Sequence, residues 1–442
     1  MLARLFSGKR KNPAKEKQPL QRAEVSTGLS SNLGKNEQMV RKVFAGCGDV
    51  VFRSLTIPAL GNRKGLVVLV GTLSNSDIIN RDIIAGLTAQ QETNKNVHTA
   101  LDLISVGEAE WHSNLDEAKT QVLLGKTLLL VDGNPEALLL ETRQSPTRAV
   151  EEPTQERIVQ GPREGFTELL KTNLGLVRRR LPTPTLKVKF MEIGSRTATR
   201  VALLYINDVA DPELLQEVET RLEAIDIDGI LEPGAIGELI SEKSWSPFPL
   251  QLNTERPDKV TGELLQGKVV LLSDGSNFAK IMPATFADFN HSPEDFYIHP
   301  VFATLTRTLR LFSFFIATTL TATYTAIITF HYEIIPRDFI TFIAEARTGV
   351  PFVPFVEALF LELSIELIRE ASLRLPGPIG GTIGIVGALV LGQAVLEARL
   401  VSPMLLIVVA LSFLASFSIP NFEASLPLRY LRFPLLVMGG LL

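Results

Sequence analysis

The pattern of apolar and polar positions changes along the chain near residue 300. Before this point charged residues are dense, and apolar residues come in short periodic runs. From Leu311 onward the chain contains long uncharged stretches, the first of them long enough to cross about 30 Å of hydrocarbon as a helix. The pattern therefore predicts a soluble α/β region of two similar subdomains, followed by an all-α helical transmembrane domain.

The prediction of two similar subdomains comes from a repeat in the first half. Gly65–Leu87 reads as a buried strand, a loop and an amphipathic helix that opens near Ser76, and Arg200–Asp226 has the same layout. The second helix has a strong start signal, because Asp211 stands at the N-cap position and Pro212 in the first turn. After each helix comes an apolar run that begins at Gly-Lys and ends in Asp-Gly.

Composition and repeat together divide the chain into five predicted segments. They are a basic disordered arm (1–35), soluble α/β subdomain 1 (36–150), a helical linker (151–190), soluble α/β subdomain 2 (191–300) and the transmembrane domain (301–442).

The Gly-Lys-Thr at residues 125–127 resembles the end of a phosphate-binding loop. That loop requires a second glycine at position 120, where this chain has Thr120. The following apolar run ends in Asp132-Gly133, which is a hairpin signal. Because Gly267-Lys268 repeats the pattern downstream, we predict two hairpins of a duplicated subdomain and no nucleotide site.

Charge adds two local features. Residues 1–22 carry seven basic residues and one acidic residue, a net charge of 7 − 1 = +6, which suits either a solvated tail or an arm near anionic lipid. A helix predicted over Glu164–Arg180 ends in three arginines, which complement a helix C-terminus as well as they would an acidic partner. The overall net charge of −4 gives no nucleic-acid signature, so no nucleic-acid partner is expected.

A search for reactive groups finds no catalytic constellation, no metal-binding motif and no cofactor site, so we expect no enzyme. The single cysteine, Cys47, excludes an internal disulfide framework. The stretch from His291 to Pro300 contains two histidines and two acids. It is interpreted as a juxtamembrane turn with aromatic anchors at Phe296 and Tyr297, with a metal site as the alternative.

The second half contains three candidate spans and the start of a fourth. They are Leu311–Phe330, Leu375–Leu396, Leu400–Phe422 and the short segment Phe433–Leu442. Because the last segment has only ten residues, we expect the chain to be truncated in its last span. Gly380 and Gly384 form a small-residue pair typical of close helix packing.

Two groups of polar residues in this half are candidates for an ion pathway. Thr318, Thr321, Thr325 and Thr329 fall on one face of the first span, where they could line water or bond back to the preceding turn. Between the first two spans, Pro351–Pro376 reads as a helix with Glu362 and Glu366 on a charged face and Glu357 apart from it. Acids inside a membrane domain mark ion paths or paired networks, although an amphipathic interfacial helix would carry the same pattern.

Several long stretches resemble the A subunit of GerA-type spore germination receptors. They are GPREGFTELLKTNLGLVRRR (161–180), DIDGILEPGAIGELI (226–240), SPFPLQLNTERPDKV (246–260), SPEDFY (292–297) and RLPGPIGGTIGIVGALVLGQAVLEARLVSP (374–403). The resemblance runs from about Asp49 to the last residue. Its signature residues are Asn253, Thr254, Glu255, Arg256, Pro257 and Asp258.

This resemblance implies an integral protein of the bacterial spore inner membrane that helps to sense nutrients and trigger germination. In that family the A subunit works with a transporter-like B subunit and a lipoprotein C subunit, and A subunits are thought to oligomerise into a ligand-gated cation channel. The soluble region is expected on the cytoplasmic, core-facing side. Two alternatives stay open: a spore-membrane paralogue that supports solute release without sensing nutrients, and a secondary transporter with a helix break near Gly377–Gly381.

Overall fold

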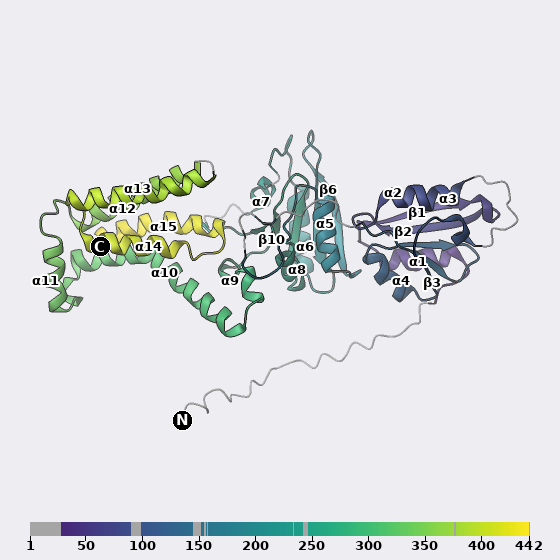
Figure 1. The fold of residues 1–442 in the computed structure, drawn as a ribbon, viewed down its shortest axis with the longest axis horizontal. Coiled ribbons are helices and arrows are strands. Elements are labelled where there is room, and N and C mark those ends of the chain that lie inside the picture. The colour runs from purple at the N-terminus through teal and green to yellow at the C-terminus, as the bar shows by residue number, and fades with distance from the viewer. Residues whose placement is uncertain are drawn as a thin grey trace, which may run out of the picture. The chain divides into compact units, whose positions relative to one another are not determined.

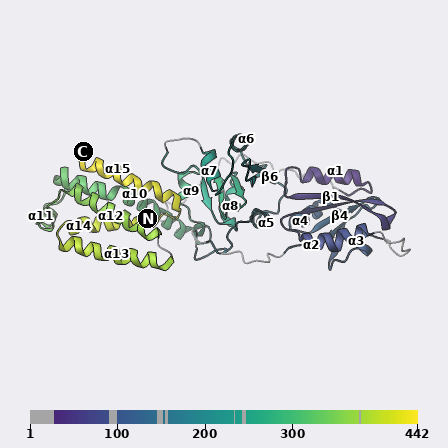
Figure 2. The same cartoon turned by 90° about the horizontal axis from the view of Figure 1, so that it is seen from above.

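The computed structural model describes residues 28–89, 99–144, 152–153, 156, 158–232, 234–241, 246–374 and 377–441, without the side chains of 373, 377–385 and 388. The predicted basic arm lies outside the described residues up to residue 27. The chain forms two units, one made of Met1–Ser145 with Pro182–Pro184 and the other of Pro146–Leu181 with Thr185–Leu442. Figures 1 and 2 show the ribbon from two directions.

The first unit is built on a five-stranded antiparallel sheet with the strand order β1-β2-β4-β5-β3. Successive side chains of a strand point to opposite faces. Leu66 and Val68 therefore pack with α1 and α4 on one face, whereas Val67 and Leu69 pack with the helical segment from α2 to α3 on the other (Figure 1). The elements are α1 (Leu33–Val43), β1 (Val50–Ile57), η1 (Pro58–Leu60), β2 (Arg63–Val70), α2 (Ser76–Ile78), the π-helical η2 (Ile79–Ile84), α3 (Ala85–Thr88), η3 (Ala100–Leu103), β3 (Ala109–His112), α4 (Leu115–Leu123), β4 (Thr127–Val131) and β5 (Ala137–Leu140).

The second unit begins with an α/β subdomain of the same design. Its sheet has the order β6-β7-β9-β10-β8, which is the order of the first sheet with every strand replaced by its counterpart. Helices α5 and α8 pack on one face, and α6 and α7 on the other. The elements are α5 (Leu170–Arg180), β6 (Leu186–Ile193), β7 (Thr199–Ile206), α6 (Pro212–Glu223), α7 (Ala235–Ile240), β8 (Leu252–Thr254), α8 (Pro257–Leu265), β9 (Val269–Ser273) and β10 (Ala279–Met282). The predicted soluble region of two similar α/β subdomains is confirmed.

The repeated Gly-Lys and Asp-Gly pairs have the same structural role in both copies. Gly125 and Gly267 follow the last turns of α4 and α8 with φ of +102° and +91°, a conformation that glycine adopts without strain. At the other end of the strand, Oδ1 of Asp132 accepts a hydrogen bond from the backbone N–H of Leu33 at 3.1 Å. Asp274 accepts the equivalent bond from Leu170 at 2.9 Å. The motif is a helix stop, a hairpin strand and a cap for the first helix of its own subdomain.

The helix expected over Glu164–Arg180 begins later, at Leu170. The residues before it are held in other pairings: the N–H of Phe166 bonds to the carbonyl of Glu255 at 2.7 Å, and that of Thr167 bonds to the side chain of Asn173 at 2.7 Å. Leu170, Leu174 and Val177 then enter the core under the second sheet. The segment expected as a linker thus supplies the counterpart of α1 and the first residues of β6.

The remaining residues are helical. The elements are α9 (Phe286–Asn290), η4 (Pro293–Phe296), α10 (Pro300–Phe330), η5 (Tyr332–Ile334), α11 (Arg337–Ala346), α12 (Pro354–Arg374), α13 (Gly377–Glu397), α14 (Pro403–Ser416) and α15 (Phe422–Leu441). Helix α10 packs against α14 and α15, and α12 packs against α13, α14 and α15. Both views show these long helices side by side, with α11 at one end of the bundle (Figures 1 and 2).

Within the described residues, α10 is the one helix that is long and apolar enough to cross a membrane, and α14 is a shorter apolar helix. The expected single span Leu400–Phe422 is wrong in its extent. Its helix ends at Ser416, and Asn421 then caps α15 by accepting a hydrogen bond from the N–H of Ala424 at 3.0 Å. The part of the expected segment that the structure describes, residues 433–441, is the later part of the 20-residue helix α15, not the start of a helix.

Candidate functional site

Two carboxylates of α12 are held by arginines of α15 inside the helical bundle. Glu362 is 3% exposed, and its Oε2 lies 3.1 Å from Nη1 of Arg432, which is 4% exposed. One turn further along α12, Glu366 pairs with Arg429. A buried charge is costly unless it is paired and hydrogen-bonded. The two pairs therefore join α12 to α15 at two successive levels.

A third arginine completes this charge cluster, which we define as Glu362, Glu366, Arg369, Arg429 and Arg432. The guanidinium of Arg369 donates to Oγ of Ser416 at 3.1 Å. It also lies over the rings of Phe413 in α14 and of Phe417, which follows α14, 4.7 and 5.4 Å from their centroids. With three guanidinium groups and two carboxylates, the cluster has a formal charge of 3 − 2 = +1. Both carboxylates are neutralised by arginine in this arrangement.

The threonines predicted to share one face of the first span are on α10, and one of them reaches the cluster. The hydroxyl of Thr321 donates to Oε1 of Glu362 at 2.9 Å. Those of Thr318 and Thr325 donate back to carbonyls of their own helix, at 2.9 Å in each case. The hydroxyl of Thr329 is buried and has no hydrogen-bond partner among the described residues. The structure thus brings Thr321 together with Glu362 and Glu366, while Thr318 and Thr325 follow the back-bonding alternative.

Glu357 lies in a different environment from the other two acids of α12. Its side chain is fully buried, and its Oε1 accepts from Nη2 of Arg347 at 2.8 Å. Its Oε2 accepts from the backbone N–H of Ser402 at 2.9 Å, at the start of α14. Glu357 therefore fastens the residues after α11 and the beginning of α14 to the first turn of α12. Gly380 and Gly384 lie in α13, but their side-chain surroundings are outside what the structure describes.

The signature residues Asn253 to Asp258 lie where β8 turns into α8. Arg256 is fully buried and donates to the backbone carbonyls of Glu156 and Pro162, at 3.3 and 2.9 Å, and to Oδ2 of Asp258 at 2.9 Å. Thr254 and the N–H of Glu255 both bond to the carboxylate of Glu156. Pro257 opens α8 at its first position, where its missing N–H costs nothing. The signature thus anchors residues 156–162 to the second α/β subdomain.

The same signature also contacts the helical part. Oδ2 of Asp258 accepts a hydrogen bond from the hydroxyl of Tyr297 at 2.7 Å. Burial and this bond raise the pKa of Tyr297 to about 12. Asn253 accepts from Nζ of Lys280 at 3.1 Å and donates to Glu423 in the first turn of α15. Burial lowers the pKa of Lys280, although Glu423 acts against this change.

A second polar contact joins Asp295 of η4 to α10. Oδ2 of Asp295 accepts from Arg310 at 2.7 Å, from Arg307 at 3.1 Å and from the N–H of Ser292 at 3.1 Å. Burial alone would raise the pKa of Asp295, but the hydrogen bonds from Arg310 and Arg307 outweigh it and hold this pKa below its usual range. We call the contacts of Asp295 with α10 and of Asn253 with α15 the junction.

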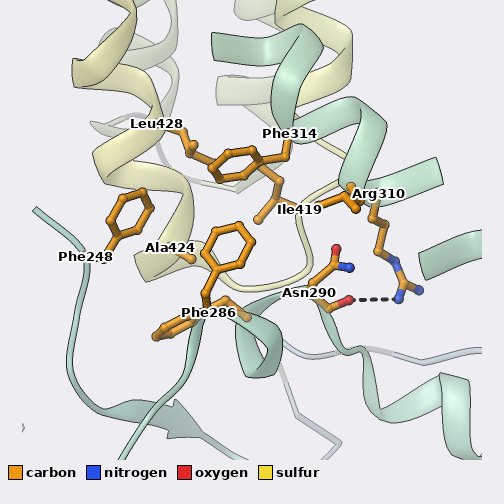
Figure 3. A pocket seen from close by; sticks show the side chains of 10 residues that line it. Phe248, Phe286, Asn290, Arg310, Phe314, Ile419, Ala424 and Leu428 are labelled. Atoms are coloured by element: carbon orange, nitrogen blue, oxygen red, sulfur yellow. Dashed lines mark hydrogen bonds between the residues drawn. The ribbon is translucent and has the colours of Figure 1, made fainter. Parts of the chain in front are cut away.

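Aromatic packing fills the space between these two contacts. Figure 3 shows the rings of Phe248, Phe286 and Phe314 facing one another, with Arg310 bonded to the carbonyl of Asn290 beside them. The ring centroids of Phe248 and Phe286 are 6.2 Å apart, and those of Phe286 and Phe314 are 5.0 Å apart. The cavity here has a volume of about 20 Å³, room for a single water molecule and no ligand. The aromatic rings therefore form a packed contact and not a ligand site.

The stretch from His291 to Pro300 contains η4 and leads into α10, and its interpretation as a juxtamembrane turn stays a prediction. Among the described residues, no three His, Cys, Asp or Glu side chains gather to hold a metal ion. The ring of His291 stands edge-on to Phe296, and burial followed by the nearby charge of Arg307 lowers the pKa of His291. Phe296 and Tyr297 are 66% and 43% exposed.

Sequence reasoning missed the arginines that complete the charge cluster. Arg429 and Arg432 are spaced three residues apart beside an apolar run, so they lie on one face of a helix. Two acids on one predicted helix of a membrane domain require partners elsewhere, and these two arginines were the available signal. Sequence reasoning also missed Glu423. Its contact with Asn253 spans 170 positions, so nothing near either residue in the sequence indicates the other.

Comparison with known proteins shows the family to which this chain belongs. The family model described as "Bacillus/Clostridium GerA spore germination protein" matches residues 38–442. Spore germination protein KA of Bacillus subtilis (strain 168) is 38% identical over 418 residues, which are 94% of this chain and 77% of that protein. The uncharacterized membrane protein YfkQ of the same organism is 36% identical, over 93% of this chain and 80% of that protein.

Two further proteins are similar to this chain. Spore germination protein GerLA of Bacillus cereus is 37% identical, over 92% of this chain and 83% of that protein. The crystal structure of the N-terminal domain of the A subunit of the Bacillus megaterium spore germinant receptor GerK3 is 32% identical, with a TM-score of 0.46, and covers 59% of this chain and 98% of that one. The family model alone covers nearly the whole sequence. The chain belongs to the GerA family of spore germination proteins.

Proposed function

We propose that this chain is the membrane subunit of a nutrient-germinant receptor and forms the oligomeric, ligand-gated cation channel of that receptor. It would work in the spore inner membrane with a transporter-like B-type subunit and a C-type lipoprotein, and its α/β subdomains would lie on the cytoplasmic side. Its relatives are spore germination proteins, which supports a role in germination. The charge cluster inside the bundle is the observation that carries the channel.

The chemistry of the cluster suggests how such a channel is gated. Charged side chains among membrane helices are expensive and typically mark ion paths. In the present arrangement Glu362 is paired with Arg432, and Glu366 with Arg429. Neither carboxylate is then free to bind a cation, which suits a closed state. Separation of α15 from α12 would release both carboxylates, and carboxylates repeated around an oligomer select cations. Thr321 of α10, whose hydroxyl bonds to Glu362, would line the same path.

Nutrient binding to a partner subunit would favour the open state through contacts that differ between the two states. A ligand shifts an equilibrium only by the difference of its affinities for the two states. The ion pairs of the charge cluster set the free energy that this difference has to overcome. Breaking a buried ion pair by removing one member costs about 3–5 kcal/mol. The ion pairs therefore stabilise the closed state strongly.

The test measures ion selectivity in vesicles that contain this chain with its B-type and C-type partners. With nutrient present, we expect K⁺ efflux, and we expect the double variant Glu362→Gln with Glu366→Gln to lower the preference for K⁺ over Cl⁻ about tenfold. Nutrient binding should stay unchanged. Glu370→Gln is the matched control, because Glu370 is on the same helix but exposed and paired with Arg374.

Three results would overturn parts of this proposal. Unchanged selectivity in the double variant would remove Glu362 and Glu366 from the path. Absence of any nutrient-dependent efflux, with the three subunits assembled, would make this chain a relay. Saturable uptake of a labelled amino acid by this chain alone would favour a secondary transporter.

A further inference from the structure

Helix α11 is amphipathic; it contacts α14 among the described residues, but much of its apolar face is left exposed. At 100° per residue, Phe339, Phe342, Ile343 and Ala346 fall on one side of the helix. None of the ten residues of α11 is buried, and Phe339 and Phe342 are 58% and 55% exposed. Exposed aromatic side chains gathered on one face mark an interaction surface.

The position of α11 in the bundle indicates what this face contacts. Helix α11 begins seven residues after the end of α10, the candidate span. Its C-terminal end is fastened by the ion pair between Arg347 and Glu357, and Figure 1 shows it crossing the direction of α12 to α15 at the end of the bundle. A helix that crosses spanning helices at their ends lies parallel to the membrane surface.

Neighbouring segments at this end expose apolar residues as well. Phe330 at the end of α10 is 43% exposed, and Ile334 in η5 is 71% exposed. Phe352 and Val353, before α12, are 46% and 60% exposed. The exposed apolar side chains at this end of the bundle thus come from several successive segments. This distribution fits contact with lipid, whereas contact with one protein partner would need only a single apolar patch.

We propose that α11 is an interfacial helix that lies in the surface of the lipid bilayer, with Phe339 and Phe342 among the acyl chains just below the headgroups. This inference rests on the membrane location in the proposed function. Such helices bury their apolar face about 5–10 Å into the boundary between headgroups and acyl chains. The polar face carries Asp338 and Glu345 besides Arg337, so the binding is apolar and does not depend on anionic lipid.

Brominated lipids, which quench tryptophan fluorescence on contact, test this location in the full chain. The two native tryptophans, Trp111 and Trp245, are first replaced by phenylalanine, and Phe342→Trp is introduced. In phosphatidylcholine vesicles with bromine on the upper acyl chain, we expect the fluorescence of this variant to fall about twofold, with no effect of aqueous acrylamide. Phe339→Trp, on the same face, serves as the second reporter.

Thr341→Trp is the matched control, because Thr341 is exposed on the polar face of the same helix. Its fluorescence should respond to acrylamide and not to brominated lipid. Addition of anionic lipid should leave the quenching of Phe342→Trp unchanged.

Each other outcome would overturn the inference. Quenching of Phe342→Trp and Phe339→Trp by acrylamide alone would place the face in water, and quenching by neither agent would mean that another protein chain covers it. Vesicle flotation, measured on the same samples, separates this inference from the proposed function. A chain that floats and shows lipid quenching but conducts no ions would refute the channel and leave α11 at the lipid surface.

Discussion

Arg256 and Glu362 illustrate two uses of a buried charge in this chain. Arg256 donates mainly to the backbone carbonyls of Glu156 and Pro162, so its partners are main-chain groups and not side chains of another helix. Glu362 is neutralised by a single side chain on another helix, Arg432, and accepts one further bond from Thr321. A charge whose partners are side chains on other helices can exchange them when helices shift. At the scale of residues, the family signature is therefore structural, and the charge cluster is the place where a switch can act.

Asp295 gives a prediction about pH. Because its folded pKa lies below the ordinary value of 3.8, the carboxylate stabilises the folded chain above about pH 4, and this contribution is lost as pH falls through the folded pKa. We expect Asp295→Asn to lower the melting temperature at pH 7 and to flatten its decline between about pH 5 and pH 2. Thermal melts of the detergent-solubilised chain measure this effect. Asp226→Asn, at an exposed position, is the control, and identical pH profiles for Asp295→Asn and the native chain would refute the prediction.

The elements of the two α/β subdomains repeat down to individual hydrogen bonds. Asn36 and Asn173 occupy equivalent places in α1 and α5, where each side chain bonds to the backbone of the residue six positions before it. The Asp-Gly turns place the side chains of Asp132 and Asp274 beside the first turns of these helices, where they accept hydrogen bonds. The two aspartate bonds each satisfy an N–H that the helix itself leaves free, and the two asparagine bonds hold the residues before each helix.

The caps give a prediction at this scale. Asp132→Ala and Asp274→Ala each remove an acceptor from a helix N-terminus, so each should lower the free energy of unfolding by about 0.5–2 kcal/mol. Chemical denaturation of the chain, followed by circular dichroism, measures the change. Asp208→Ala, in an exposed turn, should change it by less than about 0.5 kcal/mol. Equal effects at Asp208 and at the two cap positions would show that the caps contribute nothing special.

The second unit is organised as a chain of contacts from sheet to bundle. The signature residue Asn253 contacts Glu423 at the start of α15, and α15 carries the arginines that hold α12. Asp295 makes the corresponding contact with α10. Coupling between distant sites requires an element with two arrangements that both sites bias. We propose helix α15 as this element, because it contacts both the α/β subdomain and the charge cluster.

At the scale of the whole molecule, the proposed channel function predicts that loss of the junction weakens gating. We expect Asn253→Ala combined with Glu423→Gln to reduce nutrient-triggered K⁺ efflux from receptor vesicles about tenfold, a coupling loss near 1.4 kcal/mol. By linkage, the channel state should then affect nutrient affinity less as well. Tyr430→Phe, an exposed position of the same helix, is the control. Native efflux in the Asn253/Glu423 double variant would exclude the junction from the coupling path.

Much of the fold follows from local spacing in the sequence. The start of the helix at Asp211-Pro212, the two hairpins and the apolar helix α10 depend on side chains close together along the chain, and all of them are present. The start of α5 was misplaced because Phe166 bonds to Glu255, a residue far downstream. The helix expected over Leu400–Phe422 was too long because apolar composition does not reveal where a chain turns.

In the candidate site, too, some features follow from local sequence and others depend on which helices pack together. The sequence by itself determined the duplicated α/β unit, the apolar helices, and the acids and threonines of the membrane half, because periodicity and caps act over a few residues. Only the tertiary structure decided that Glu362 meets Arg432 across 70 positions and that Asn253 meets Glu423 across 170. Pairing of charges depends on which helices pack together, and that choice is made by the summed burial of whole faces, which no single stretch of sequence contains.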